Sequence, residues 1–456
     1  MYRHAEADLL LWKSKGNRKP LIIRGARQVG KTYLVREFSK KFNNLIEINF
    51  ERNPEVAQLF SSNDPLKIVQ LLELQFNITI QAGQTLLFLD EIQAQPQIIA
   101  VLRYFYEEMP QLHIIAAGSL LEFALESPVF SMPVGRIEYF YLGPLRFSEF
   151  LLAMGKEKLA HYLAEFTVRQ VIADPIHQQL MDDMRIFLVT GGMPEAMKVY
   201  RDSRSWKECE EVKNGILATF QDDFNKYGQR VNQYALQLSF QKIPLMVGRK
   251  FKYVYVDPDL RSSELSKALH LLCLARVATQ AFHTSANGVP LGAEVNHKKF
   301  KIIFLDVGLM ASANGLCLLD FEKARDVMLV NKGAVCEQFV GQHLLYVQEY
   351  FQKPELYYWA REQKTSSAEI DYLISHGAEI IPVEVKAGSG GRLKSLHLFL
   401  KEKERSLGVR FNSEPPSLLE TEMALPGSRR RLFSLLSLPL YLVEQTRRLV
   451  EECLSG

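Results

Sequence analysis

The chain has 456 residues, 47% of them hydrophobic and 23% charged, which is typical of a globular protein with room for about three domains. A net charge of +3 is too small to indicate a nucleic-acid partner by itself. Its five scattered cysteines form no C-x-x-C pair and exclude a disulfide scaffold and a cysteine zinc knuckle. No apolar run approaches the length of a membrane span, and charged residues interrupt the first ten positions. We therefore expect a soluble, cytoplasmic protein with no signal peptide and no membrane partner.

The first motif reads GARQVGKT and matches the phosphate-binding loop pattern G-x-x-x-x-G-K-[ST] at every fixed position. Apolar residues before it predict a buried strand over 21–23, and the spacing after it predicts a helix over 33–38. Such a loop directs backbone N–H groups at a phosphate. We predict that ATP binds here, with Lys31 on the β- and γ-phosphates and Thr32 on Mg²⁺. The predicted nucleotide contacts are Gly25, Ala26, Arg27, Gln28, Val29, Gly30, Lys31 and Thr32.

Two further strands are predicted to end in polar residues. An uninterrupted apolar run over 85–89 is followed by Asp90, a predicted Mg²⁺ ligand, and Glu91, predicted to polarise the attacking water. Acidic residues that only cap the following helix are the alternative. The run 112–117 leads to Ser119, which we expect to bond the γ-phosphate or the water, or to serve plain turn chemistry.

The order of these segments resembles the AAA+ class of P-loop ATPases, in particular the bacterial and archaeal family with an AAA-type N-terminal half and a conserved, DUF4143-type C-terminal half. The matching segments read GARQVGKT, LLFLDEIQ, AAGSLL, VGRIEYFYLGPLRFSEFL and GGMPEA. The resemblance implies that Ser119 is the sensor-1 residue and that Arg136 is an arginine finger. Such a finger acts on a neighbouring subunit's nucleotide, so it implies a homo-oligomer. Arg136 as an ordinary surface residue is the alternative, and Arg103 and Arg146 are further candidates.

The middle of the chain is predicted to contain a helix over 265–274 and two strands that flank an Asn-Gly turn at 287–288. A helix followed by a two-stranded ribbon resembles a winged helix. Lys298, Lys299 and Lys301 are then expected either to contact phosphates or to form a solvated strand face. KIIFLDVGL, which begins at Lys301, also matches the C-terminal half of the resembled family.

A second constellation lies in the predicted strand–turn–strand hairpin over 370–385. Asp371 lies on the first strand, Glu384 and Lys386 share a face of the second, and Glu337 lies in a helical segment. Converging carboxylates suit Mg²⁺ or Mn²⁺, and a lysine beside them can activate a water for attack on a phosphodiester. The pattern resembles the PD-(D/E)xK nuclease fold, which implies DNA as a partner. A salt-bridged strand pair is the alternative.

These observations predict an α/β protein with four parts. They are a P-loop AAA+ parallel-sheet core over 1–150, a helical lid over 151–205, a winged-helix-like segment over 206–310, and a restriction-endonuclease-like α/β domain over 311–456. The leading hypothesis is an ATPase whose nucleotide cycle controls a DNA-facing C-terminal module. One alternative is a nucleotide-dependent switch with a non-catalytic nuclease-like domain, and another is a metal-dependent nuclease gated by ATP.

Overall fold

The computed structural model describes residues 1–119, 121–125, 133–227, 231–316, 332–363, 366–388, 393–424 and 430–455. The chain divides into two compact units. The first unit consists of Met1–Pro144 together with the short segments Leu274–Val277 and Gln348–Pro354. The second unit consists of Leu145–Cys273, Ala278–Val347 and Glu355–Gly456.

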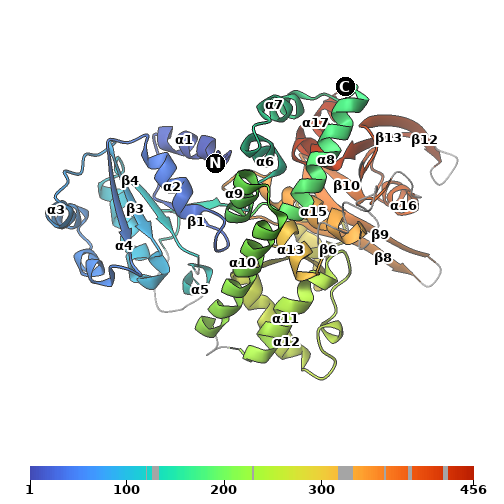
Figure 1. The fold of residues 1–456 in the computed structure, drawn as a ribbon. Coiled ribbons are helices and arrows are strands. Elements are labelled where there is room, and N and C mark those ends of the chain that lie inside the picture. The colour runs from blue at the N-terminus through green and yellow to red at the C-terminus, as the bar shows by residue number, and fades with distance from the viewer. Residues whose placement is uncertain are drawn as a thin grey trace. The chain divides into compact units, whose positions relative to one another are not determined.

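The first unit is built on a five-stranded parallel sheet in the order β2-β3-β4-β1-β5 (Figure 1). Its strands are β1 (Leu21–Arg24), β2 (Asn44–Asn49), β3 (Thr85–Asp90), β4 (His113–Ala117) and β5 (Glu138–Tyr141). Its helices are α1 (Ala5–Ser14), α2 (Lys31–Ser39), α3 (Pro65–Phe76), α4 (Gln97–Glu108) and α5 (Leu121–Leu125), with short 3₁₀ turns at Pro54–Phe60 and Ile92–Ala94.

Helices cover both faces of this sheet, which explains why its central strands read as continuous apolar runs. Every residue of β3 and of β4 is buried. One face packs in a cluster that joins Ile22 and Leu87 to residues of α3 and α4. On the other face Trp12 of α1 meets Phe38 of α2. Because all five strands are parallel, the loops that follow β1, β3 and β4 emerge at the same edge of the sheet.

The second unit contains an eight-stranded mixed sheet in the order β12-β13-β11-β10-β9-β8-β6-β7. The strands are β6 (Ala278–Thr284), β7 (Val295–Phe304), β8 (Tyr357–Gln363), β9 (Ser366–His376), β10 (Glu379–Val385), β11 (Leu407–Asn412), β12 (Ser417–Ala424) and β13 (Arg430–Pro439). The α-helices are α6 (Phe147–Ala153), α7 (Glu157–Glu165), α8 (Asp174–Thr190), α9 (Pro194–Ser203), α10 (Trp206–Tyr227), α11 (Gln233–Met246), α12 (Ser262–Leu274), α13 (Val307–Ala313), α15 (Lys332–Tyr346), α16 (Lys394–Glu402) and α17 (Thr446–Ser455). Short 3₁₀ turns lie at Tyr253–Tyr255, Leu291–Glu294 and Leu440–Gln445.

The predicted helix and ribbon of the middle segment are present as α12, β6 and β7. The ribbon is not a free-standing wing, however, because β6 also pairs in parallel with β8 and so continues the large sheet. A local pattern indicates two strands and a turn, but it does not indicate a third strand from 73 residues further along the chain. The winged helix is therefore not confirmed, and neither is a nuclease fold for the C-terminal half.

Two sequence motifs meet around one buried carboxylate in the second unit. Asp306, which precedes α13, is fully buried and accepts hydrogen bonds from the N–H groups of Gly192 (2.7 Å) and Leu309 (3.0 Å). A Cβ on Gly308 would lie 2.5 Å from the backbone nitrogen of Gly191, whose φ of 73° also favours glycine. GGMPEA and LDVGL therefore form a packing junction between α8, α9 and α13, and the role of GGMPEA at this junction is structural.

Candidate functional site

The predicted phosphate loop connects β1 to α2. Gly30, the residue before α2, has a left-handed φ of 91°, a conformation that glycine adopts without strain. A Cβ on Gly25 would lie 2.3 Å from the carbonyl oxygen of Leu142, so glycine is required there as well. The loop therefore leads into the N-terminus of a nine-residue helix, where backbone N–H groups and the helix dipole favour an anion.

Lys31 lies inside this loop. Its ammonium donates hydrogen bonds to the carbonyl oxygens of Gly25 (3.0 Å) and Ala26 (2.8 Å). Burial lowers the pKa of Lys31 to about 8, although the charges of Glu91 and Asp90 act in the opposite direction. A buried ammonium beside an anion cradle fits a triphosphate, whose negative charge would restore the pKa toward its usual range.

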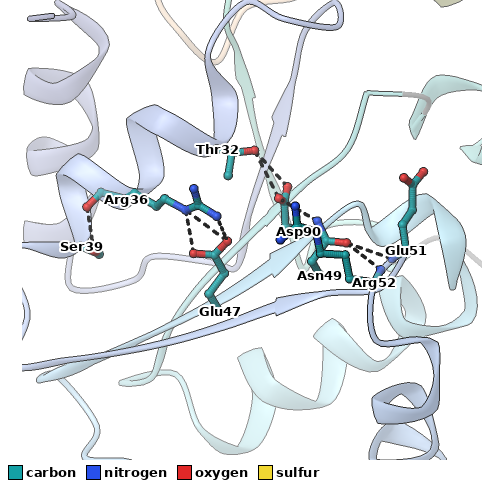
Figure 2. Close-up of polar contacts among 8 residues, drawn as sticks. All are labelled: Thr32, Arg36, Ser39, Glu47, Asn49, Glu51, Arg52 and Asp90. Carbon is teal, nitrogen blue, oxygen red and sulfur yellow. Dashed lines mark hydrogen bonds and ion pairs between the residues drawn. The ribbon is translucent and has the colours of Figure 1, made fainter.

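Thr32 and Asp90 lie together at the carboxyl edge of the sheet (Figure 2). The Thr32 hydroxyl donates to the two carboxylate oxygens of Asp90, at 3.2 and 3.4 Å. Burial, followed by the charge of Glu91, raises the pKa of Asp90 to about 6. Mg²⁺ in nucleotide sites takes one or two protein oxygens together with phosphate oxygens and water. These two residues fit that ion, and they would hold it although no group of three or more His, Cys, Asp or Glu among the described residues is arranged to bind a metal.

Asn49, at the end of β2, completes this edge and was missed by the sequence reasoning. Its side-chain amide donates to Asp90 at 3.3 Å, while its carbonyl oxygen accepts from the backbone N–H groups of Glu51 and Arg52 (Figure 2). Asn49 is the register partner of Asp90 on the neighbouring strand. A polar residue at the end of a strand is a weak signal, and the pairing of β2 with β3 decides its place.

Glu91 and Ser119 are also brought together. Glu91 has a left-handed φ of 50°, and one of its carboxylate oxygens accepts from the Gln93 amide at 2.7 Å. The same oxygen lies 3.3 Å from the Ser119 nitrogen and 3.4 Å from its hydroxyl. A Cβ on Gly118 would lie 1.9 Å from the Gln93 side-chain oxygen, so glycine leaves room for this glutamine. Gln93 is a second residue that the sequence reasoning missed.

Arg3 ties the start of the chain to the loop. It is buried, and its guanidinium donates to the carbonyl oxygens of Val29 (2.9 Å) and Gly143 (2.8 Å). No motif marks this arginine, because its partners are backbone groups distant in the sequence.

The three arginine candidates occupy different environments. Arg136 is 42% exposed, and its guanidinium lies 2.8 Å from Glu107 of α4. Arg103 shares that carboxylate at 3.1 Å. The Arg146 side chain instead donates to the carbonyl oxygen of Tyr346, and its backbone N–H donates to Glu149 in a helix cap. Arg146 therefore has a structural role in the second unit, and a finger at Arg136 stays a prediction.

The C-terminal candidates also converge, but around a lysine. Glu337 lies on α15, Asp371 on β9 and Glu384 on β10, with Lys386 just after that strand. Lys301 of β7 is only 1% exposed. Both sequence interpretations of Lys301, a phosphate contact and a solvated strand face, are wrong because the large sheet buries it.

Ion pairs connect the members of this group. The Lys301 ammonium lies 3.3 Å from Glu337 and 3.1 Å from Asp371, and Lys386 pairs with Glu384. Burial raises the pKa of Glu337 to about 8 and that of Glu384 to about 7, and the charge of Asp371 acts in the same direction. Burial alone would lower the pKa of Lys301, but the surrounding carboxylates outweigh it and hold the pKa well above its usual value. The salt-bridged pair, kept open as an alternative for Glu384 and Lys386, is present. A metal ion and cleavage chemistry at this place stay predictions.

Comparison with known families assigns three parts of the chain. Residues 17–151 match the family described as an AAA domain. Residues 181–319 match a domain of unknown function, DUF8612, and residues 332–427 match another, DUF4143. The comparison with curated protein sequences gives no match. Together with the parallel sheet and the phosphate loop, these matches define an AAA-type N-terminal domain in a chain that also carries a DUF4143 domain. The resemblance expected from the sequence is confirmed to that extent.

Solved structures give distant likenesses. A Walker-type ATPase of Pyrococcus abyssi is 17% identical over 69% of this chain and 95% of its own, with a TM-score of 0.44. The ORC2 protein of Aeropyrum pernix, in ADPNP–ADP complexes, is 12% identical over 70% of this chain and 93% of its own, with a TM-score of 0.33. The ORC1 protein of the same organism, in complex with DNA, is 12% identical over 71% of this chain and 94% of its own, with a TM-score of 0.28. At these TM-scores the likenesses carry no functional inference.

Within the described part of the chain, no helix combines the length and the apolar character that a bilayer crossing requires.

Proposed function

We propose that this protein binds ATP with Mg²⁺ and hydrolyses it in the first unit. The observation that carries the proposal is the meeting of the phosphate loop, the Thr32–Asp90 pair and the Glu91–Ser119 contact at one edge of a parallel sheet. Lys31 and the loop N–H groups bind the phosphates, Glu91 orients and deprotonates the attacking water, and Ser119 positions Glu91. Thr32 and Asp90, directly or through water, would hold Mg²⁺, which would neutralise charge on the phosphates.

Phosphate release measured with saturating Mg-ATP tests this assignment. Glu91→Gln keeps the side-chain shape but removes the base, so we expect nucleotide binding to persist while turnover falls at least about a hundredfold. Lys31→Ala should abolish binding of a fluorescent ATP analogue, because the loop loses its cation. Glu55→Gln, an exposed glutamate outside the site, is the matched control and should behave as the wild type. Equal turnover of Glu91→Gln and the wild type would remove Glu91 from the reaction.

A nucleotide-dependent switch is the second candidate, and one observation favours it. The Glu91 carboxylate already accepts from Gln93 and Ser119, and Lys31 already bonds to two loop carbonyls. These hydrogen bonds hold Glu91 and Lys31 in a resting state, and a bound nucleotide would have to break them. Single-turnover and steady-state rates separate the two candidates. A switch gives slow release, with a bound-nucleotide lifetime of minutes, whereas an ATPase gives repeated turnover.

We further propose that the nucleotide cycle controls a nucleic-acid-facing module in the second unit. The support is an exposed basic and aromatic stretch around β7. Lys298 and Lys299 lie on the exposed part of that strand, and the backbone of Phe251, which bonds to Phe300 of β7, leads to the exposed Lys252 and Tyr255. Lysines bind phosphates and tyrosines stack on bases. DNA binding that is the same with ATP, with ADP and without nucleotide would contradict this coupling.

A further inference from the structure

The second unit contains a carboxylate cluster, which we define as Glu337, Glu369, Asp371 and Glu384. It is independent of the nucleotide site. The ammonium of Lys301 lies within the cluster, 2.6 Å from Glu369, 3.1 Å from Asp371 and 3.3 Å from Glu337. These acids come from α15 and β9, and Lys301 comes from β7, at the far edge of the same sheet. Two separate elements thus supply the acids that surround a cation from a third.

Glu384 supplies a second, independent observation. Its side chain is 5% exposed, and one carboxylate oxygen pairs with Lys386. The other oxygen has no hydrogen-bond partner among the described residues and is itself buried. Asp371 meanwhile accepts a hydrogen bond from the backbone N–H of Val385 at 2.8 Å, which fixes it beside the end of β10. An unpartnered buried carboxylate oxygen next to a fixed carboxylate can accept a cation when the Lys301 ammonium is absent.

The carboxylate cluster has room for one cation, either an ammonium or a divalent metal ion, but not for both at once. Carboxylate oxygens hold Mg²⁺ at about 2.0–2.1 Å and hydrogen-bond an ammonium at about 2.7–3.2 Å. A metal bound by Asp371 and Glu337 would lie a few ångströms from the Lys301 nitrogen, and the two cations would repel each other strongly in a buried site. The long flexible stem of lysine reaches the centre of the cluster without moving the backbone. The residues present therefore do not fit a resident metal.

We propose that the Lys301 ammonium is the resident cation of this carboxylate cluster, and that Mg²⁺ or Mn²⁺ binds there only when this ammonium is removed. Lys301 then ties α15, β7 and β9 together through Glu337 and Asp371, and the hydrogen bond from Val385 to Asp371 ties β9 to β10. The C-terminal half does not cleave phosphodiesters by metal-dependent chemistry, and its nucleic-acid contact in the proposed function is recognition.

Metal binding to the nucleotide-free, full-length chain tests the proposal. Lys301→Met keeps the length of the side chain and removes its charge, and we expect it to gain one Mn²⁺ equivalent, bound at least tenfold tighter than any Mn²⁺ that the wild type takes up. The additional Asp371→Asn change should abolish the gain. Lys299→Met, a change at the exposed lysine two residues earlier on β7, is the matched control and should gain nothing. Free Mn²⁺ is counted by electron paramagnetic resonance. A folded Lys301→Met protein that takes up no extra Mn²⁺ would overturn the proposal.

A second measurement leaves Lys301 unchanged, because Lys301→Met leaves several buried acids without a cation and risks misfolding. Fe²⁺ with ascorbate and peroxide cuts a polypeptide beside a bound metal ion. We expect no cuts between residues 369 and 386 in the wild-type chain. Cuts there that Asp371→Asn abolishes would mean that a metal binds despite the lysine, and the proposal would fail whatever the fate of the variant.

Discussion

Gln93 is a single side chain on which the position of the proposed catalytic base depends. Its amide is the nearest donor to Glu91, at 2.7 Å, and Gly118 leaves the space that it occupies. Gln93→Ala is expected to lower kcat about tenfold with little change in KM, because Glu91 loses a charge-assisted hydrogen bond but the phosphate contacts remain.

Steady-state kinetics with Gln97→Ala as the control check this expectation. Gln97 is exposed and its side-chain amide donates to the Gln95 side chain, away from Glu91, so its loss should leave kcat unchanged. A Gln93→Ala protein whose KM rises while kcat stays constant would show that Gln93 acts on nucleotide binding and does not position Glu91.

His113 at the start of β4 makes the first unit sensitive to acid. It is buried against Trp12 and Phe42, with ring centroids at 5.7 and 4.9 Å. Burial, followed by the charge of Arg18, lowers the pKa of His113 to about 4, below the usual value of about 6.5. The unfolded chain therefore binds a proton between these two pH values and the folded chain does not. Stability is lost as the pH falls through 6.5, by about 2 kcal/mol between pH 7.5 and 5 from this residue.

Hydrogen exchange in peptides that cover β4 measures this effect. His113→Gln is neutral at both pH values, so its protection should decrease less than that of the wild type between pH 7.5 and 5, when the two proteins are compared at the same pH. An equal decrease in both proteins would assign the acid sensitivity to other groups.

At the scale of elements, the sequence predicted the strands and turns that depend on a local residue pattern. The buried runs before Gly25, Asp90 and Gly118 are strands, Asn287 and Gly288 lie in the connection between β6 and β7, and the hairpin with Asp371 is formed. Each of these rests on periodicity or on turn residues within about ten positions.

Features that depend on the pairing of distant strands were not predictable in this way. Asn49 meets Asp90 only because β2 lies beside β3, and Lys301 meets Asp371 only because β7 belongs to the large sheet. A single sequence carries no signal for such pairings, so a buried ion pair at Lys301 looks the same as a solvated lysine. For that reason the motifs predicted most of the nucleotide site, whereas no motif indicated that Lys301 lies at the centre of the carboxylate cluster.

We predict that the exposed lysines at the outer end of β7 bind nucleic acid. Lys298 and Lys299 are exposed there, and the proposed module also includes the exposed Lys252 and Tyr255, which follow the bond from Phe251 to Phe300. Changing both β7 lysines to alanine is expected to weaken DNA binding about tenfold at low salt and to reduce the salt dependence of binding, because fewer phosphates are neutralised. Fluorescence anisotropy with single- and double-stranded oligonucleotides measures both quantities. Lys198→Ala with Lys207→Ala, which removes two exposed lysines elsewhere in the second unit, is the control. If both double variants weaken binding equally, β7 is not the contact.

At the scale of the whole molecule, the question is whether one chain is enough for catalysis. Arg136 lies in the first unit, paired with Glu107 at the surface of α4, and is 42% exposed. An arginine finger stabilises the charge that develops on the γ-phosphate and contributes about 10³–10⁵ to the rate. Its surface position is compatible with action on the nucleotide of a second copy. A finger at Arg136 would make assembly a condition for turnover.

Mixing two inactive variants is the sharpest test of whether Arg136 acts on the nucleotide of a second copy. Arg136→Ala is expected to retain ATP binding and lose at least a hundredfold in turnover, and Glu91→Gln is inactive for a different reason. In a mixed oligomer, an Arg136→Ala subunit keeps its own Glu91 and can receive the finger of a Glu91→Gln neighbour, so part of the activity should return. Arg103→Ala controls for loss of the shared Glu107 contact and should remain active. Sizing with and without nucleotide should show assembly under the conditions in which activity returns. A chain that stays monomeric yet hydrolyses ATP at full rate, with Arg136→Ala equally active, would mean that the site is complete within one subunit.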